Sequence, residues 1–118
     1  MTSYRPGLHI LSTFEAPASA LTDVESCRAG FNRLIQELGL SKVGEVYHSF
    51  PNGGFTAVIC LTESHVSVHT WPESGLATFD VFLSNFQHDN TLKVRQFYAE
   101  ALRLFEVTSV IHEQEITR

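Results

Sequence analysis

A turn between two strand-like stretches constrains this 118-residue chain more than any other feature. Residues 42–50 and 55–61 are both rich in β-branched and aromatic side chains, which favour strands. Between them lies Pro51-Asn52-Gly53-Gly54, which favours a tight turn because glycine and asparagine accept positive φ angles. The pattern predicts a β-hairpin, and with it an antiparallel sheet.

Four other short stretches predict further strands, at residues 7–14, 65–71, 76–83 and 107–111. The second of these alternates between apolar and polar side chains. Val66 and Val68 should face one side of the sheet. His65, Ser67 and His69 should face the other side. One sheet face is therefore expected to carry polar groups.

Two stretches, 17–38 and 91–105, show the 3.6-residue period of amphipathic helices. In the first, Thr22 and Glu25 have capping-box spacing, a start nearer Pro17 is the alternative, and Gly39 is placed to close the last turn. The resulting order is β-α-β-β-β-β-α-β. We expect an α+β two-layer sandwich, an antiparallel sheet covered on one face by two helices. No linker divides the chain, so residues 1–118 should form a single domain.

Composition narrows the range of partners. Eight Lys plus Arg against 13 Asp plus Glu give a net charge of -5, and the basic residues are scattered, which disfavours nucleic-acid binding. No export signal opens the chain, and no apolar run approaches membrane-spanning length. Cys27 and Cys60 lie in apolar stretches, where buried reduced thiols are expected, as in a cytoplasmic protein. We expect a small-molecule partner or another protein chain.

The densest polar stretch runs from Thr62 to Glu73, between and along two strands that otherwise resemble core. The simplest interpretation is a solvated sheet face. A shared metal ion is disfavoured, because His65 and His69 are four residues apart on a strand and thus roughly 13 Å from each other; we predict no metal site. A third interpretation is a self-processing serine at Ser64.

Residues 61–73, L-T-E-S-H-V-S-V-H-T-W-P-E, closely resemble the cleavage-site motif E-S-H-x-x-I-H-T-W-P-E of the prokaryotic S-adenosylmethionine decarboxylases. The hairpin ending at Phe50, its glycine-rich turn and the D-V-F segment from Asp80 to Phe82 are similar to that family as well. The predicted element order also resembles the family over most of the chain. The chain is therefore identified as a divergent member of this pyruvoyl-dependent family.

The resemblance implies self-cleavage between Glu63 and Ser64. In the family, the serine hydroxyl attacks the preceding carbonyl and converts the amide to an ester, and β-elimination and hydrolysis then split the chain. The products here would be residues 1–63 and 64–118, the second beginning with a pyruvoyl group derived from Ser64. That built-in cofactor forms a Schiff base with the substrate amine and accepts the electrons released with carbon dioxide. Processing demands a base near Ser64, a strained or exposed peptide bond, and hydrogen bonds to the intermediate.

The resemblance also implies roles for individual residues. His69 matches the family's processing histidine, Phe50 an aromatic that stacks on adenine, and Glu73 a carboxylate that holds the ribose hydroxyls. His65 is a further candidate for substrate binding. Outside such a motif, an aromatic beside a turn is as often part of the core, and a lone carboxylate usually has no role.

Three positions depart from the family pattern. Ser84 stands where F-T-C-G places a catalytic cysteine, and a hydroxyl is a far weaker acid than a thiol. Thr56 replaces the serine of G-V-S-G that assists processing, which preserves a hydroxyl. Thr13 stands where an acidic residue is expected. Cys60 shares the strand parity of Thr56, but we expect a buried core thiol.

Two classes of function remain open. The first is a pyruvoyl-dependent decarboxylase, which acts on S-adenosylmethionine to make the aminopropyl donor for spermidine, or on an amino acid such as arginine or ornithine. The second, favoured by Ser84, is an uncleaved non-catalytic or regulatory homologue. The resemblance further implies a homodimer in which Phe50 and its hairpin approach the Ser64 site of the other subunit, and open sheet edges also favour pairing.

Overall fold

The computed structural model describes residues 4–118. Its strands are β1 (Leu8–Glu15), β2 (Lys42–Ser49), β3 (Phe55–Leu61), β4 (Ser64–Trp71), β5 (Leu76–Leu83) and β6 (Ser109–Thr117). Its helices are α1 (Ala18–Leu21), α2 (Val24–Glu37), α3 (Thr91–Leu104) and a single 3₁₀ turn, η1 (Pro72–Ser74). The predicted hairpin is present, and every predicted strand and helical region has a counterpart.

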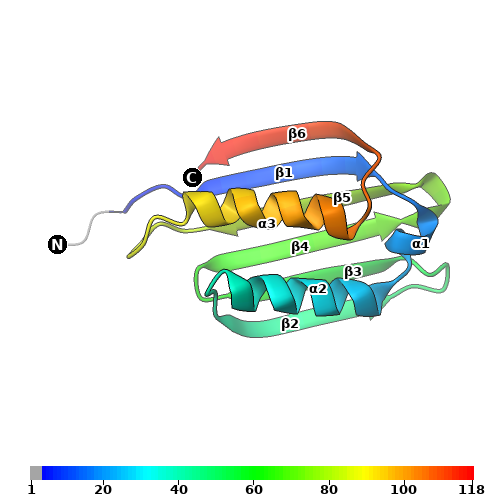
Figure 1. Cartoon of the computed structure of the whole chain (residues 1–118), viewed down its shortest axis with the longest axis horizontal. Coiled ribbons are helices and arrows are strands. Elements are labelled where there is room, and N and C mark those ends of the chain that lie inside the picture. Colours follow the sequence, from blue (N-terminus) through cyan, green and yellow to red (C-terminus); the bar gives the residue numbers. More distant parts are fainter. Residues whose placement is uncertain (1–3) are drawn as a thin grey trace.

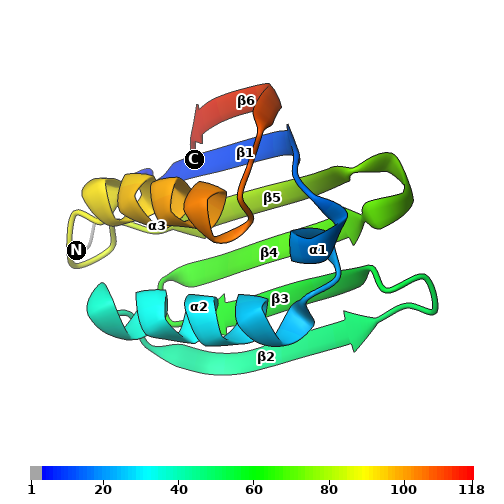
Figure 2. The same ribbon diagram turned by 45° about the vertical axis from the view of Figure 1, so that its right-hand side comes forward.

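All six strands form one antiparallel sheet in the order β2-β3-β4-β5-β1-β6. Strand β1 therefore lies between β5 and β6, although it is first in sequence. Helices α2 and α3 lie across the same face of the sheet (Figure 1, Figure 2). Within residues 4–118, no helix covers the opposite face, which we call the open face. The predicted two-layer α+β sandwich is confirmed.

The core lies between the two long helices and the covered face of the sheet. Along β5, alternate residues from Ala77 to Leu83 are buried, because side chains of a strand point to opposite faces in turn. From α2, the Phe31 ring contacts those of Phe79, Phe97 and Phe105, at centroid separations of 6.2, 5.5 and 6.2 Å. Truncating such a ring to alanine typically costs about 3–5 kcal/mol. Aromatic packing thus fixes the helices on one face only.

The region predicted as one helix over 17–38 is two helices. The Thr22 hydroxyl donates to the Ala18 carbonyl, at 2.8 Å, where α1 ends. Asp23 then caps α2 by accepting from the Ser26 amide at 3.0 Å. The predicted capping box of Thr22 and Glu25 is therefore wrong, because a carboxylate one residue later makes the cap. The alternative start near Pro17 is correct for α1, whose N-cap is Pro17. Gly39 does follow α2 with a φ of 68°, as predicted for a terminating glycine.

The last strand is longer than the predicted segment 107–111. Strand β6 pairs with β1 over its length, from Ser109 to Thr117, and all nine of its residues are exposed. An exposed edge strand has no apolar alternation, so its extent leaves little signal in the sequence. Arg95 of α3 contacts it through two hydrogen bonds to Glu115, at 2.6 and 3.0 Å.

The two cysteines differ from each other. Cys27 is buried as expected, and burial raises the pKa of its thiol to about 12, which makes it a poor nucleophile. Cys60 is exposed, so the expectation of a core thiol is wrong there: it lies at an outward position of β3, where the apolar side chains on either side face the core. Among residues 4–118, no helix is long and apolar enough to cross a membrane.

Candidate active site

The predicted site residues lie at opposite ends of β4. Ser64 is its first residue, and His69 is five residues further along. At about 3.3 Å per residue, their Cα atoms are roughly 16 Å apart, too far for His69 to act as a base on Ser64 of the same chain. We call the region of Glu63, Ser64 and Ser84 the cleavage end, and the region around His69 the pocket end.

Backbone strain is concentrated at the cleavage end. Ser64 has a φ of 147°, and among residues 4–118 the only other non-glycine residue with positive φ is Glu106, at 55°. Residues with a Cβ atom rarely adopt such backbone angles, and holding a residue there costs on the order of 1–3 kcal/mol. Leu61 pairs with Ser64, so the turn between β3 and β4 is only two residues long. The strain therefore adjoins the Glu63–Ser64 peptide bond.

The carbonyl of that bond is held by a backbone donor. The Ser84 amide donates to the Glu63 carbonyl at 2.8 Å, and the Asn90 side chain donates to the Ser84 carbonyl, also at 2.8 Å. An N–H group aimed at a carbonyl oxygen stabilises the negative charge that develops when a nucleophile adds to the carbon. A cavity of about 150 Å³ adjoins this bond, lined by Thr62, Glu63, Ser84, Phe86, Gln87, His88 and Asn90.

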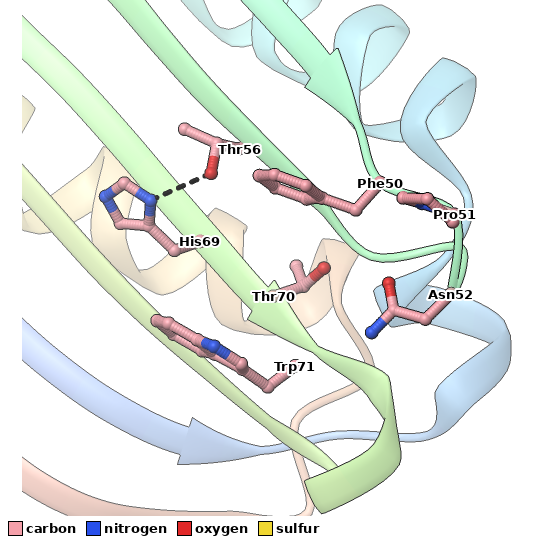
Figure 3. A pocket seen from close by; sticks show the side chains of 7 residues that line it. All are labelled: Phe50, Pro51, Asn52, Thr56, His69, Thr70 and Trp71. Atoms are coloured by element: carbon pink, nitrogen blue, oxygen red, sulfur yellow. Dashed lines mark hydrogen bonds between the residues drawn. The ribbon is translucent and has the colours of Figure 1, made fainter.

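The pocket end holds a larger and less polar cavity. It measures about 420 Å³ and is lined by Phe50, Pro51, Asn52, Thr56, His69, Thr70 and Trp71. Thr56 and His69 are directly opposite on β3 and β4, and the Thr56 hydroxyl lies 3.0 Å from His69 Nδ1. Phe50 and Trp71 flank this pair (Figure 3). The arrangement combines aromatic surface with one oriented imidazole.

The hairpin turn builds one wall of the pocket. The Phe50 amide donates to the Gly54 carbonyl at 2.7 Å, and Gly53 takes a φ of 91° that favours glycine. A Cβ on Gly54 would lie 2.8 Å from the Pro72 ring, so the turn closes against η1. The Asn52 side chain donates to the Glu73 carboxylate at 2.5 Å. Glu73 is not itself a lining residue of the pocket, but this hydrogen bond holds it beside Asn52, which is one.

Between the two ends, the open face carries a polar cluster that the sequence patterns did not group. Asp80 Oδ2 lies 2.8 Å from Nε2 of both His9 and His65, and the Ser67 hydroxyl donates to the other oxygen. Burial opposes ionisation of Asp80, but the hydrogen bonds from His65, Ser67 and His9 outweigh it and lower its pKa to about 2. His65, the candidate for substrate binding, is bound within this cluster.

The cluster also has the composition of a metal site. One ligand atom each of His9, His65 and Asp80 lie within 4.8 Å of one another. However, the Arg118 guanidinium lies 3.4 Å from His9 Nδ1, and its positive charge opposes a cation there. The sequence signal for this cluster was limited to polar residues at outward positions of β1, β4 and β5. The strand order that brings these residues together was not predicted.

Thr13, the remaining departure, lies away from the scissile bond, whereas Cys60 lies closer to it. Thr13 pairs with Thr78 on β5 and with His112 on β6, and no cleavage-end residue is among these partners. Cys60 pairs with His65, and is therefore one position removed from the Leu61–Ser64 pair.

Fold and site together define a class of protein: a small α+β sandwich whose central strand begins at a strained Glu-Ser bond. A family model described as S-adenosylmethionine decarboxylase matches residues 8–115. The chain belongs to the S-adenosylmethionine decarboxylase family. The fold agrees with a solved relative, the adenosylmethionine decarboxylase from Aquifex aeolicus, with a TM-score of 0.84 and 29% identity over 98% of this chain and 92% of that one.

Relatives of similar length support the assignment. The S-adenosylmethionine decarboxylase proenzyme of Persephonella marina is 33% identical over 109 residues, 92% of this chain and 81% of the relative. That of Archaeoglobus fulgidus is 33% identical over 107 residues, 90% of this chain and 92% of the relative. A shorter match, to the proenzyme of Aquifex aeolicus, reaches 42% identity over 77 residues, which is 57% of that relative.

Proposed function

We propose that this protein cleaves itself between Glu63 and Ser64 and then decarboxylates S-adenosylmethionine, yielding the aminopropyl donor for spermidine. The observation that carries the proposal is the conformation of the cleavage end. Ser64 has strained backbone, and the preceding carbonyl already accepts a hydrogen bond from Ser84. Family relatives named as proenzymes agree with a chain that is processed after synthesis.

The cleavage can be followed atom by atom. The Ser64 hydroxyl oxygen bonds to the Glu63 carbonyl carbon, the C–N bond breaks, and the amide becomes an ester with a free amine at residue 64. Relief of the φ strain favours this exchange, and the Ser84 amide stabilises the oxyanion as it forms. Loss of the Cα proton of residue 64 then breaks its Cβ–O bond and releases the Glu63 carboxylate, which ends residues 1–63. The dehydroalanine left at residue 64 becomes an imine, and water replaces its nitrogen, which releases ammonia and leaves residues 64–118 with a pyruvoyl end.

The pyruvoyl group formed in this way would supply the carbonyl that takes up electrons when carbon dioxide leaves. The residues around Ser64 fit its formation, because a hydroxyl, a strained bond and an oxyanion donor coincide there. Ser64 and Ser84 therefore belong to the reacting part of the site. The substrate must also contact the aromatic pocket, which lies at the pocket end of β4.

We place the base for cleavage in a second subunit. His69 is roughly 16 Å from Ser64 along β4, so its imidazole cannot act on Ser64 of the same chain. Two-fold pairing through the open face can set the pocket end of one subunit against the cleavage end of its partner, forming two equal sites. Thr56 then orients the His69 ring from its own chain, through the 3.0 Å contact.

The pocket end suits the adenosyl part of the substrate. Phe50 and Trp71, each 44% exposed, offer flat apolar surface for stacking on a purine. Glu73 offers carboxylate oxygens to ribose hydroxyls, and Asn52 fixes its position. A decarboxylase for arginine or ornithine would make little use of this aromatic surface, so S-adenosylmethionine is the preferred substrate.

One observation favours a second function. Ser84 replaces the family's cysteine at the cleavage end, and a hydroxyl gives up a proton much less readily than a thiol. The alternative is an uncleaved, non-catalytic homologue that uses the pocket to bind a ligand or regulate a partner.

Intact mass under denaturing conditions separates the two functions. After long incubation we expect two fragments, 1–63 and 64–118, the second with a pyruvoyl amino end. Cleaved protein should then release labelled carbon dioxide from carboxyl-labelled S-adenosylmethionine, with arginine and ornithine as comparison substrates. A single uncut chain would refute the enzyme and support the regulatory homologue.

A further inference from the structure

A histidine outside the family motif lines the cavity at the cleavage end. The cavity of about 150 Å³ beside Glu63 and Ser84 is also bounded by His88, from the connection between β5 and α3. Building on the proposed function, we propose that His88 donates the proton that replaces carbon dioxide on the substrate. His88 would thereby serve as the acid in place of the family's cysteine thiol, which Ser84 replaces here.

The proton transfer balances without any other reactant. Departure of carbon dioxide breaks one carbon–carbon bond and leaves its electron pair with the remaining part of the substrate. One proton must then bind the carbon that lost the carboxylate. The His88 imidazolium gives up its N–H proton and becomes neutral, and water restores that proton because the side chain is exposed.

The chemistry of the cavity wall points to His88. A proton donor works best when its pKa is close to the working pH, and histidine is the residue type that meets this condition near neutrality. Serine, threonine, glutamine and asparagine side chains on the wall are far weaker acids. Carboxyl side chains as a class are bases at neutral pH.

The neighbouring carboxyl group is likewise unsuited. Asp89 accepts a hydrogen bond from the Thr91 amide at 3.0 Å, and this bond at the start of α3 holds its pKa below the usual value. Glu63 shares the cavity wall with His88 and Asp89 shares its loop, and we assign the proton transfer to neither carboxyl group.

Hydrogen bonds at both ends of the connecting segment, residues 84–90, hold it against the cleavage end. Asn90 is buried, its side chain donates to the Ser84 carbonyl at 2.8 Å, and its amide donates to Asn85 Oδ1 at 2.7 Å. The Asn85 side chain donates in turn to the Pro6 carbonyl at 3.0 Å. The loop that carries His88 therefore begins at Ser84, whose amide holds the scissile carbonyl, and its other end, Asn90, is bound to that same residue.

The first test compares His88→Gln with His112→Gln, a matched change on the exposed edge strand β6. Both should cleave fully by intact mass, because cleavage does not use His88. We expect kcat for carbon dioxide release to fall about 100-fold or more in His88→Gln, the usual contribution of a positioned acid, and to stay unchanged in His112→Gln. Ser84→Cys should restore most of that loss in the His88→Gln background.

A second readout needs no turnover. In the uncleavable Ser64→Ala protein, the His88 ring resonances should shift when S-adenosylmethionine is added, while those of His112 stay in place. A third readout follows turnover. If the proton reached the pyruvoyl carbon instead, the substrate nitrogen would stay on that carbon and water would release the rest of the substrate as an aldehyde. The chain 64–118 would then begin with alanine, and its mass after turnover should show more of this form in His88→Gln.

Each failure has its own signature. Unchanged turnover in His88→Gln, an unmoved His88 resonance, or a loss that Ser84→Cys does not restore would overturn the role of His88 while leaving the decarboxylase intact. Wild-type protein that cleaves but releases no carbon dioxide would overturn the proposed function and His88 with it.

Discussion

The two ends of β4 carry different kinds of structure. At the cleavage end, backbone groups dominate: a positive φ at Ser64, a carbonyl held by the Ser84 amide, and a small cavity. At the pocket end, side chains dominate: Phe50, Trp71 and the pair of Thr56 and His69 around a cavity nearly three times as large.

Within one chain, the cleavage end is thus suited to breaking a bond and the pocket end to binding a substrate. A strained bond needs a rigid frame, which the adjacent ladders and the hydrogen bond from the buried Asn90 side chain to Ser84 provide at the cleavage end. A substrate pocket needs accessible apolar surface, which the hairpin and the end of β4 provide. The prediction with the largest effect tests the cleavage end directly.

Ser64→Ala should abolish cleavage completely, because no hydroxyl remains to attack the Glu63 carbonyl. Intact mass after long incubation measures this, with Ser109→Ala on the edge strand as the matched control. Any fragmentation of Ser64→Ala at the same bond would show that the cleavage end does not act through this side chain.

Mixed dimers test whether the two ends meet across subunits. Phe50→Ala alone should weaken substrate binding roughly 5- to 150-fold, the range for one lost stacking contact. Combined with Ser64→Ala in a heterodimer, it should give back one undamaged site of the two, as two-fold symmetry requires. Activity no higher than that of the Phe50→Ala homodimer, in heterodimers that demonstrably form, would break the shared-site arrangement.

Asp80→Asn tests the polar cluster between the ends. The Asp80 side chain is 21% exposed, and its pKa falls from 3.8 to about 2 on folding, which contributes about 2 kcal/mol at neutral pH. Because the folded pKa is the lower one, this stability is present above pH about 4 and lost as pH falls towards 2. Urea unfolding at several pH values should show this loss in wild type and not in Asp80→Asn. The exposed change Glu37→Gln serves as control.

Thr56→Val should have the smallest effect. It removes a single hydrogen bond to His69, worth about 1 kcal/mol, so the rate of self-cleavage should fall about fivefold. Thr56→Ser keeps the hydroxyl and should cleave at close to the wild-type rate. Equal rates in all three proteins would show that the His69 ring needs no support from β3.

Local patterns in the sequence predicted most of the fold. The turn at 51–54 and the alternation in 65–71 have short-range physical causes, and both elements are present. The exposed strand β6 and the split at Asp23 were not predicted, because one lacks apolar periodicity and the other depends on which residue makes the cap.

The sequence predicted which residues belong to the site but not how they are arranged in space. The motif placed Ser64 and His69 in one short segment, yet an extended strand keeps residues five apart at a distance. The contacts of Asp80 with His9 and His65 depend on the order of three strands, and no local pattern encodes that order. His88 carried no signal, since its position matters only through the cavity it shares with Glu63.

The position of β1 determines what becomes of a cut chain. Residues 1–63 contain β1, β2 and β3, and residues 64–118 contain β4, β5 and β6. Three ladders join the two pieces, β3 to β4, β1 to β5 and β1 to β6, so the pieces interlock and separate only by global unfolding. Once apart they must find each other by diffusion, so recovery after unfolding becomes dependent on concentration. The uncut precursor would refold as one chain, and the mature form would hold together chiefly by kinetics.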